Sequence, residues 1–468
     1  MLLINGLVAG ENGALRQDVR IDGELVSEVG TSLTPRENEQ VIDAGEKIIL
    51  PGGVDVHTHM DLDLGYVRAT DDFYTGTVAA ACGGTTTIVD HMAFGPRGCS
   101  IRHQLDVYHR LAEGRAVVDY GFHGVLDHVD GIILDEVKEL SREGITSHKF
   151  YLTYGGKISD TEVIRLMECA SGCGIMLAVH AENDGTITYL RDKYRTMGHT
   201  GPIWHARSRP PESEAEAVGR MTMLAAMAGD APVYFVHMSA GLSLDILRMA
   251  RARGQKNLFS ETCPQYLLLD ESAYLRDDGL KFIMSPPLRA KKNQRALWEG
   301  VRGGDIDVIA TDHCPFFYSR EKQLGKDDFT QAPGGVPGVE TRIPLMFSRY
   351  AAGKLDLVTL VTLCCAKPAR LFGVYPQKGV IAVGSDADLV LIDPSVKAML
   401  TCDMLHENTD YTPYEGFPVA GYPVMTISRG EIIVKEGMFI GQAGRGKFLK
   451  RGLPNLKQSG GQAWQHSQ

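Results

Sequence analysis

The most informative segment of this chain is Pro51-Gly52-Gly53-Val54-Asp55-Val56-His57-Thr58-His59, which follows the apolar run Ile48-Ile49-Leu50. Such a run predicts a β-strand that ends at the histidines. Alternate side chains of an extended strand share a face, so His57 and His59 should point the same way. Two imidazoles at a strand end can bind one metal ion. A histidine pair alone is more often structural, so a metal site requires further ligands elsewhere in the chain.

Length, composition and charge limit the class of protein. A chain of 468 residues with 44% hydrophobic content can bury a large core, in one large domain and a smaller one. A net charge of −10 and a pI near 5.9 do not favour a nucleic-acid partner. The nine cysteines include no C-x-x-C pair and indicate reduced thiols in the cytoplasm. No apolar stretch reaches the ~18 residues that span a bilayer, so no membrane association is expected.

Residues 51–372 alternate short apolar runs with longer amphipathic segments. The runs predict eight strands, at residues 54–59, 85–90, 116–121, 147–152, 175–180, 233–237, 258–261 and 308–312. Helical patterns lie between them, for example at residues 161–170, 214–228 and 242–252. Eight strand–helix units predict an α/β fold, a (β/α)8 TIM-like barrel whose chemistry lies at the C-terminal strand ends. A doubly wound open sheet is the alternative.

Short strand patterns occupy both ends of the chain. Residues 1–50 contain the turn signals Asn5-Gly6 and Asp22-Gly23-Glu24, which predict hairpins. Neither this segment nor residues 373–440 can fold alone, so we predict that they form one small β-sandwich domain beside the barrel. Residues 441–468 are basic and lack acidic side chains. We expect a solvated or subunit-packing C-terminal arm whose last twelve residues are disordered.

Residues able to bind a metal end several of the later predicted strands. They are Lys149, His180, His237 and Asp312. A lysine in an apolar strand is costly to bury as a cation and tends to become neutral. Each of these residues could be an ordinary core polar group. Their shared position at C-terminal strand ends is hard to explain by packing alone, so the sequence indicates a metal centre.

Five motifs carry a resemblance that extends over nearly the whole chain. They are the segment 51–59, Gly83-Gly84-Thr85-Thr86-Thr87, Glu261-Thr262-Cys263-Pro264-Gln265-Tyr266-Leu267, Ser285-Pro286-Pro287-Leu288-Arg289 and Thr311-Asp312-His313-Cys314. With them the chain resembles the hydantoinase and dihydropyrimidinase family of cyclic amidohydrolases, in particular its bacterial D-phenylhydantoinases. The resemblance implies an enzyme that hydrolyses the cyclic amide bond of 5-substituted hydantoins to N-carbamoyl amino acids, using a metal-bridging hydroxide.

The resemblance also implies two divalent metal ions per subunit. Their ligands would be His57, His59 and Asp312 for one ion and His180 and His237 for the other, with Lys149, carboxylated by CO2, bridging both. Zinc is the expected metal from the ligand types, and manganese or cobalt could also fit. Asp312 would orient the hydroxide, take its proton and pass that proton to the leaving nitrogen.

The residues that contact substrate follow from the same resemblance. Tyr154 would donate a hydrogen bond to the oxygen that becomes anionic. The backbone of Ser285 would contact the ring amide, as would Gly334, which lies where the family often has the asparagine of a Pro-Asn-Gly motif. Three residues of the loops at 60–72 and 151–158 would suit an aromatic substituent, namely Leu64, Tyr151 and Ile158.

Other histidines are expected to play lesser parts. We expect packing or supporting roles for His91, His123 and His128, whereas His313 could donate a hydrogen bond beside Asp312. The small-molecule substrate is the partner we expect, in a homotetramer.

Several related activities are alternatives. Dihydropyrimidinase and allantoinase would use a similar metal set. Dihydroorotase fits less well, because the pair Met60-Asp61 follows the histidines and an aspartate would repel the substrate carboxylate. A non-enzymatic scaffold like the collapsin-response-mediator proteins would have lost metal ligands, whereas this chain keeps every ligand position.

Overall fold

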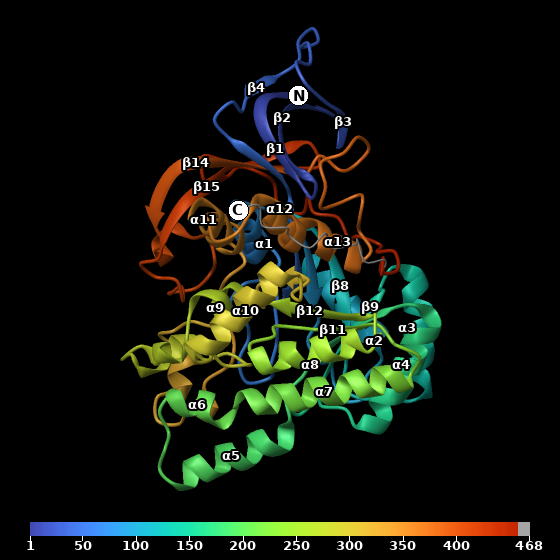
Figure 1. The fold of residues 1–468 in the computed structure, drawn as a ribbon, viewed down its shortest axis with the longest axis vertical. Helices are drawn as coiled ribbons and strands as arrows, with labels where there is room; N and C mark the ends of the chain where they lie inside the picture. Colours follow the sequence, from blue (N-terminus) through green and yellow to red (C-terminus); the bar gives the residue numbers. More distant parts are fainter. Residues whose placement is uncertain (457–468) are drawn as a thin grey trace.

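Eight parallel strands form the centre of the computed structural model, which describes residues 1–456 (Figure 1). The strands neighbour one another in chain order. They are β6 (Gly53–Thr58), β7 (Thr85–His91), β8 (Asp119–Leu126), β9 (Ser147–Tyr151), β10 (Met176–His180), β11 (Val233–Phe235), β12 (Leu258–Thr262) and β13 (Val308–Ile309). Parallel strands in sequential order, joined by helices, are typical of a (β/α)8 barrel. The predicted fold is confirmed.

The first and last strands complete the ring. Thr58 at the end of β6 forms a parallel bridge with His313, just beyond β13. Deeper in the barrel the Arg342 guanidinium donates to the carbonyl oxygens of Val54 and Ile309, both at 3.0 Å. This buried arginine satisfies the backbone groups where β6 and β13 do not pair directly. The alternative of an open sheet is therefore wrong.

Thirteen α-helices of the described residues pack mainly around the barrel (Figure 1). They are α1 (Thr75–Cys82), α2 (Ile101–Ala112), α3 (Gly131–Glu143), α4 (Asp160–Cys173), α5 (Asp184–Thr196), α6 (Ile203–Ser208), α7 (Pro211–Met227), α8 (Gly241–Ala252), α9 (Pro264–Leu268), α10 (Lys291–Gly303), α11 (Arg342–Ala351), α12 (Leu357–Val361) and α13 (Lys367–Leu371). Helix α4 shows why such segments begin and end where they do. A capping box of Ser159 and Glu162 begins it, and Gly174 in the left-handed conformation ends it.

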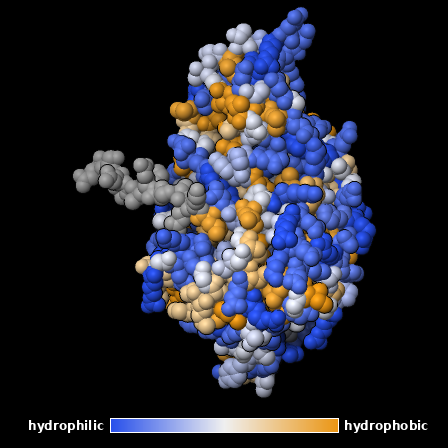
Figure 2. Space-filling view, turned by 90° about the vertical axis from the view of Figure 1, so that its right-hand side faces the viewer, coloured by the Kyte–Doolittle hydropathy of each residue, from blue (hydrophilic) through white to orange (hydrophobic). Residues whose placement is uncertain are grey.

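Across residues 1–456, none of the helices combines the length and the apolar character needed to cross a membrane. Figure 2 shows hydrophilic side chains over most of the face in view, interrupted by smaller apolar patches.

One barrel strand lies away from its predicted position. The sequence predicted a strand at residues 116–121, whereas β8 runs from Asp119 to Leu126. The sequence did not indicate the true strand, because its apolar pattern is interrupted by Gly121, His123 and Gly124. The histidine fits inside the barrel because Ser147 Oγ and the Val56 carbonyl oxygen lie 2.7 and 3.0 Å from its ring nitrogens.

Both chain ends contribute to one nine-stranded sheet, as predicted for the small β domain (Figure 1). Its strands are β1 (Leu2–Gly10), β2 (Gly13–Asp22), β3 (Leu25–Gly30), β4 (Val41–Asp43), β5 (Ile48–Pro51), β14 (Leu389–Met399), β15 (Pro418–Ser428), β16 (Glu431–Lys435) and β17 (Met438–Phe439). Strand β5 lies between β1 and β14 and so joins the two chain ends. The sheet curls back until Leu25 of β3 bridges to Asp386, just before β14.

Only one of the two predicted turns is a turn. Gly23 and Glu24 connect β2 to β3, as expected. Asn5 and Gly6 instead lie within β1, where the pairing register shifts and Asn5 has a φ of 64°. A β-bulge with a left-handed residue has the same sequence signature as a tight turn. A Cβ on Gly6 would lie 2.4 Å from Ile49 Cδ1, so the bulge leaves no room for a side chain.

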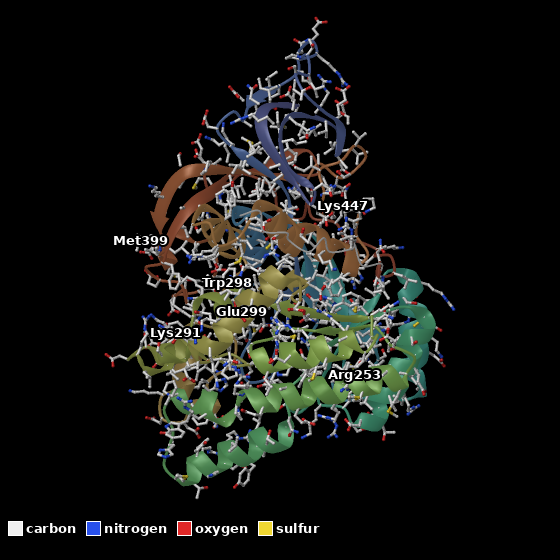
Figure 3. The ribbon with its side chains drawn as sticks, viewed as in Figure 1. Arg253, Lys291, Trp298, Glu299, Met399 and Lys447 are labelled. Atoms are coloured by element: carbon white, nitrogen blue, oxygen red, sulfur yellow. The ribbon has the colours of Figure 1, made fainter. Side chains whose placement is uncertain are left out.

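The described part of the C-terminal arm packs on its own barrel instead of extending into solvent. Figure 3 shows Lys447 beside the boundary between the barrel and the small sheet. The Lys447 amide donates to Asp119 Oδ1 at 2.8 Å, and its ammonium pairs with Glu24. The Arg451 side chain is buried and donates to Ser147 Oγ at 2.9 Å. These basic residues meet carboxylates and carbonyl groups far away in the sequence. The predicted disorder of residues 457–468 lies outside the described residues.

Lys378 connects the barrel with the small sheet. Its fully buried ammonium lies 2.6 Å from Asp119 of β8 and 2.9 Å from both Asp386 and Asp388. Burial opposes its charge, but the three carboxylates raise the pKa of the ammonium. We expect Lys378→Met to lower the free energy of unfolding by about 3–5 kcal/mol, because it leaves the buried carboxylates of Asp386 and Asp388 without their cation. Thermal unfolding measures this, with exposed Lys397→Met as control, and equal melting temperatures would contradict it.

Candidate active site

A cavity of about 1050 Å³ lies at the C-terminal ends of the barrel strands. All six residues predicted to bind metal line it, namely His57, His59, Lys149, His180, His237 and Asp312. The C-terminal ends of the parallel strands share one rim of the barrel. They therefore bring together residues far apart in the sequence, such as His57 and Asp312, which are 255 positions apart. Cavities of this size accommodate small organic molecules.

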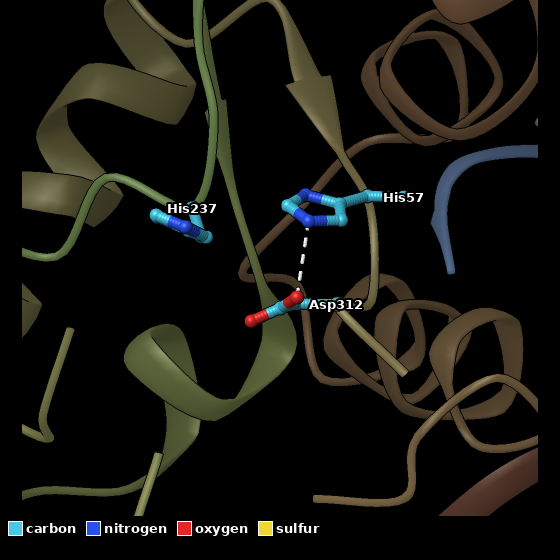
Figure 4. Close-up of side chains that lie close together, drawn as sticks. All are labelled: His57, His237 and Asp312. Carbon is cyan, nitrogen blue, oxygen red and sulfur yellow. Dashed lines mark ion pairs between the residues drawn. The ribbon is translucent and has the colours of Figure 1, made fainter. Parts of the chain in front are cut away.

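Asp312 forms the centre of the first group of ligands (Figure 4). Its Oδ1 lies 3.0 Å from His57 Nε2 and 3.2 Å from His59 Nε2. The two histidine rings therefore face the same oxygen, as the strand alternation predicted. His237 approaches from the opposite side, with a ligand atom within 4.8 Å of those of His57 and Asp312. Three potential ligands from three strands thus surround a space of the size of a metal ion.

The second group lies next to the first. The rings of His180 and His237 meet edge to face, with centroids 4.6 Å apart. Lys149 comes from β9, and its side chain is buried beside them. Burial lowers the pKa of its ammonium to about 8. Among the described residues no hydrogen bond or ion pair reaches this amine, whose nearest recorded contact is the Tyr151 ring at 5.2 Å.

The protonation states favour metal binding. Burial lowers the pKa of His59 to about 4 and also lowers those of His180 and His237, so these rings are neutral and carry a free lone pair. Burial would raise the pKa of Asp312, yet His57 and His59 hold it well below its usual range. Within the described structure, His57 Nε2 lies close to Asp312 without a hydrogen bond of good geometry, and His59 Nδ1 and His237 Nδ1 have no hydrogen-bond partner. Burial would also lower the pKa of His57, but Glu261 and Asp312 raise it to about 9, so this ring gives up a proton when it binds a metal. The neutral rings of His59, His180 and His237 and the ionised carboxylate fit a cation at this site.

Glu261, at the end of β12, organises the ligands although the sequence did not single it out. Its Oε1 lies 2.6 Å from His57 Nδ1 and accepts the His237 backbone N–H at 2.8 Å. Its Oε2 accepts the Tyr234 hydroxyl at 2.8 Å. A carboxylate behind a histidine fixes the ring orientation and leaves Nε2 facing the cavity. An acidic residue ending an apolar strand was the signal that could have identified it.

A second buried carboxylate supports His180. Glu182 Oε2 lies 2.9 Å from His180 Nε2 and pairs with the buried Arg209 guanidinium. The same guanidinium lies over the Tyr154 ring, 5.3 Å from its centroid. Burial would raise the pKa of Glu182, but Arg209 and His180 lower it to about 2. This ion pair therefore links a predicted metal ligand to the tyrosine of the predicted substrate site.

Three predicted site residues have backbone conformations that side chains rarely adopt. The φ angles are 70° at Tyr154, 40° at His237 and 54° at Asp312. Left-handed residues other than glycine cost about 1–3 kcal/mol each and gather at functional sites. The surrounding barrel holds these residues so that their side chains turn into the cavity.

The predicted substrate residues gather on one wall of the cavity. Tyr154, Ser285 and Gly334 all line it. The place of a Cβ on Gly334 is 3.8 Å from Ser285 Oγ, so these two segments lie side by side. Burial raises the pKa of the Tyr154 hydroxyl to about 12, partly offset by Arg209. This hydroxyl therefore stays protonated at neutral pH and can donate a hydrogen bond.

Two of the three predicted apolar wall residues reach the cavity. Leu64 and Tyr151 line it, and Leu64 is 39% exposed. Ile158 is 5% exposed and belongs to the main hydrophobic core, outside the cavity lining of the described residues. Its backbone N–H donates to the Tyr151 carbonyl at 3.1 Å. This hydrogen bond holds the Ile158 backbone against Tyr151, while the Ile158 side chain packs into the hydrophobic core. The structure thus does not bring Ile158 to the predicted pocket.

The four histidines for which the sequence predicted lesser parts do not belong to the group of metal ligands. His91 packs edge-on against His57 at 4.4 Å and stacks on His123 at 4.1 Å between ring centroids. His128 lies beside Asp127, 2.6 Å from its carboxylate. His313 does not donate to the neighbouring Asp312, because its Nε2 faces Asp71 at 3.0 Å, and its Nδ1 accepts two backbone N–H groups.

Comparison with known proteins identifies the family. The model of the amidohydrolase family matches residues 48–433, from β5 through the barrel to β16. This chain belongs to the amidohydrolase family. Over 452 residues this amidohydrolase is 50% identical to a D-phenylhydantoinase of Escherichia coli O1:K1, and the match covers 96% of this chain and 98% of that protein.

Solved structures agree along the whole length. A dihydropyrimidinase from Brevibacillus agri NCHU1002 is 41% identical with a TM-score of 0.94, covering 97% of this chain and 99% of its own. A D-hydantoinase from Bacillus sp. AR9 is 40% identical with the same TM-score and the same coverage. The predicted resemblance to the hydantoinase and dihydropyrimidinase family is confirmed.

Proposed function

We propose that this amidohydrolase hydrolyses the cyclic amide bond of 5-substituted hydantoins and releases N-carbamoyl amino acids. The observation that carries the proposal is that Asp312, four histidines and the buried Lys149 amine line one cavity, with His57, His237 and Asp312 close enough to share a metal ion. The relatives named D-phenylhydantoinase and D-hydantoinase support the hydantoin ring as substrate. The relative named dihydropyrimidinase favours a six-membered cyclic amide as the second candidate.

The ligand set supports two divalent cations per subunit, and zinc is the metal we propose. His57, His59 and Asp312 would hold one cation and His180 and His237 the other. Lys149 would bridge them once its neutral amine has added CO2 to become an anionic carbamate. When bound, the cations would lower the pKa of a water molecule and polarise the amide carbonyl of the substrate.

Two side chains of the chain itself carry the remaining steps. Asp312 is ionised and faces the cavity, so it can accept the proton of the attacking water and deliver it to the leaving ring nitrogen. Tyr154 remains protonated beside Arg209 and donates to the carbonyl oxygen as its negative charge develops. The backbones of Ser285 and Gly334 hold the ring against this wall.

A substrate panel with metal analysis tests the proposal. The panel contains 5-phenylhydantoin, hydantoin, dihydrouracil, allantoin and dihydroorotate. We expect a ring-opened carbamoyl product from hydantoins and close to two equivalents of bound metal. No metal and no turnover would favour a non-enzymatic scaffold, and exclusive turnover of allantoin would favour an allantoinase. We also propose a cytoplasmic homotetramer, which light scattering would test for its subunit number.

A specificity prediction follows from the apolar wall. Because Leu64 and Tyr151 line the cavity, 5-phenylhydantoin should be hydrolysed with a higher kcat/KM than unsubstituted hydantoin. Burying the phenyl surface at ~25 cal/mol/Å² supplies about 2 kcal/mol, or a factor of roughly 30. Leu64→Ala should reduce this preference, and Leu15→Ala, at an exposed position of the small sheet, serves as control. Faster turnover of dihydrouracil with no effect of Leu64→Ala would contradict the prediction.

A further inference from the structure

Lys322 is a buried lysine outside the group of metal ligands. It lies in the short helix η3 (Glu321–Gly325), and its side chain is fully buried. Its ammonium donates to the carbonyl oxygen of Ile283 at 2.7 Å and to that of Pro333 at 2.8 Å. No ion pair with a carboxylate is recorded for it within residues 1–456. The amine also lies over the Phe316 ring, 5.8 Å from its centroid, and burial lowers its pKa to about 7. Burying an amine without a carboxylate partner is costly, which calls for an explanation.

The two carbonyl groups belong to the two segments assigned to the substrate ring. Ile283 lies two residues before Ser285, and Pro333 immediately precedes Gly334. The Ile283 carbonyl oxygen also accepts the Gly335 N–H at 3.0 Å. The Lys322 amine and one backbone hydrogen bond therefore join the two segments, both of which line the cavity. Their facing sides are close, as the 3.8 Å between Ser285 Oγ and a Cβ built on Gly334 shows.

The contact also acts on the peptide group itself. The carbonyl of Pro333 and the N–H of Gly334 belong to the same peptide unit. A hydrogen bond from the lysine amine to the carbonyl oxygen polarises that unit and strengthens its N–H as a donor, since connected hydrogen bonds reinforce one another. The ammonium thus sets both the spacing of the two backbones and the strength of one polar group that faces the cavity.

We propose that Lys322 is a positioning residue for the substrate ring, which fixes the backbones of Ser285 and Gly334 at the spacing that the cyclic amide requires. The proposal rests on the proposed function, because it takes these two backbones as ring contacts. A purely structural lysine would affect stability alone, whereas this position predicts a change in substrate binding with the chemical step preserved.

The test compares Lys322→Met and Lys322→Arg with Lys326→Met, an exposed lysine just after the same helix. Steady-state kinetics use the panel compound that the wild-type enzyme hydrolyses best, and metal content is measured in parallel. We expect KM to rise at least tenfold in Lys322→Met, with kcat within about threefold and metal content unchanged. Lys322→Arg keeps hydrogen-bond donors and should raise KM by about threefold. Lys326→Met should match the wild type.

The outcomes separate the two proposals. If the wild type hydrolyses no cyclic amide, the proposed function fails and this inference fails with it. If the wild type is active and Lys322→Met keeps a KM within twofold, or loses kcat at unchanged KM, only the role of Lys322 is overturned. Should Lys322→Met fail to fold by circular dichroism, Lys322→Arg decides, and a wild-type KM in that variant overturns the proposal.

Discussion

Asp312→Asn will lower kcat on hydantoins by about three orders of magnitude, while the protein keeps its fold. The substitution preserves size but removes the group that accepts and delivers the proton, a function that contributes about 10²–10⁴ in rate. The carboxylate faces the cavity and is ionised, because His57 and His59 hold its pKa well below the usual range, so it carries no proton of its own before the reaction. Single-turnover kinetics measure the effect on the chemical step.

Metal content distinguishes loss of the proton carrier from loss of a ligand. The amide oxygen of asparagine can still face His57 and His59, so we expect bound metal to remain above half of the wild-type value. Asp305→Asn provides a matched control, because this half-buried carboxylate pairs with Arg248 just before β13, at the opposite end of that strand from Asp312. A kcat within tenfold of the wild type would show that another residue transfers the proton.

Lys149→Ala will abolish metal bridging and reduce activity by more than 10³-fold. Its amine is buried, its pKa is lowered to about 8, and it has no recorded ion-pair partner in the described structure. Such an amine is neutral often enough to add CO2 near neutral pH, and alanine cannot supply the carbamate. We expect partial recovery when a short carboxylic acid enters the space, because its oxygens can replace those of the carbamate.

The experiment that adds a carboxylic acid to Lys149→Ala has a control and two outcomes that would contradict the prediction. Lys138→Ala, at an exposed lysine of α3, should have wild-type metal content and no response to the acid. Full activity of Lys149→Ala without any added acid would contradict the carboxylated lysine. Loss of activity with two equivalents of metal still bound would contradict its bridging role.

Much of the fold and the site could be predicted because strand ends in a barrel share one rim. Eight apolar runs in order imply parallel neighbours, and residues that end those runs must then meet. Hence His57, His180, His237 and Asp312 were found as one group before any distance was known. Lys149 was assigned to that group because a lysine is unusual in an apolar strand.

Side-chain partners could not be predicted, because they depend on contacts between distant residues. Glu261 holds the His57 ring from 204 positions away, in a strand that does not neighbour β6. Glu182 is only two positions from His180, but its charge is balanced by Arg209, which is distant in the sequence. The same limit explains the displaced strand β8, whose His123 is tolerated only because Ser147 and Val56 satisfy its ring.

The sequence by itself determined the order of the barrel strands, the joining of both chain ends and the identity of the residues at the rim, because periodicity and strand-end position are local properties. The tertiary structure decided which rim residues face the cavity. Ile158 turned into the core because its backbone pairs with Tyr151, and Lys322 became a link between two loops because a buried ammonium must find acceptors. Both outcomes depend on the packing of segments far apart in the chain, where the cost of an unsatisfied polar group selects the partner.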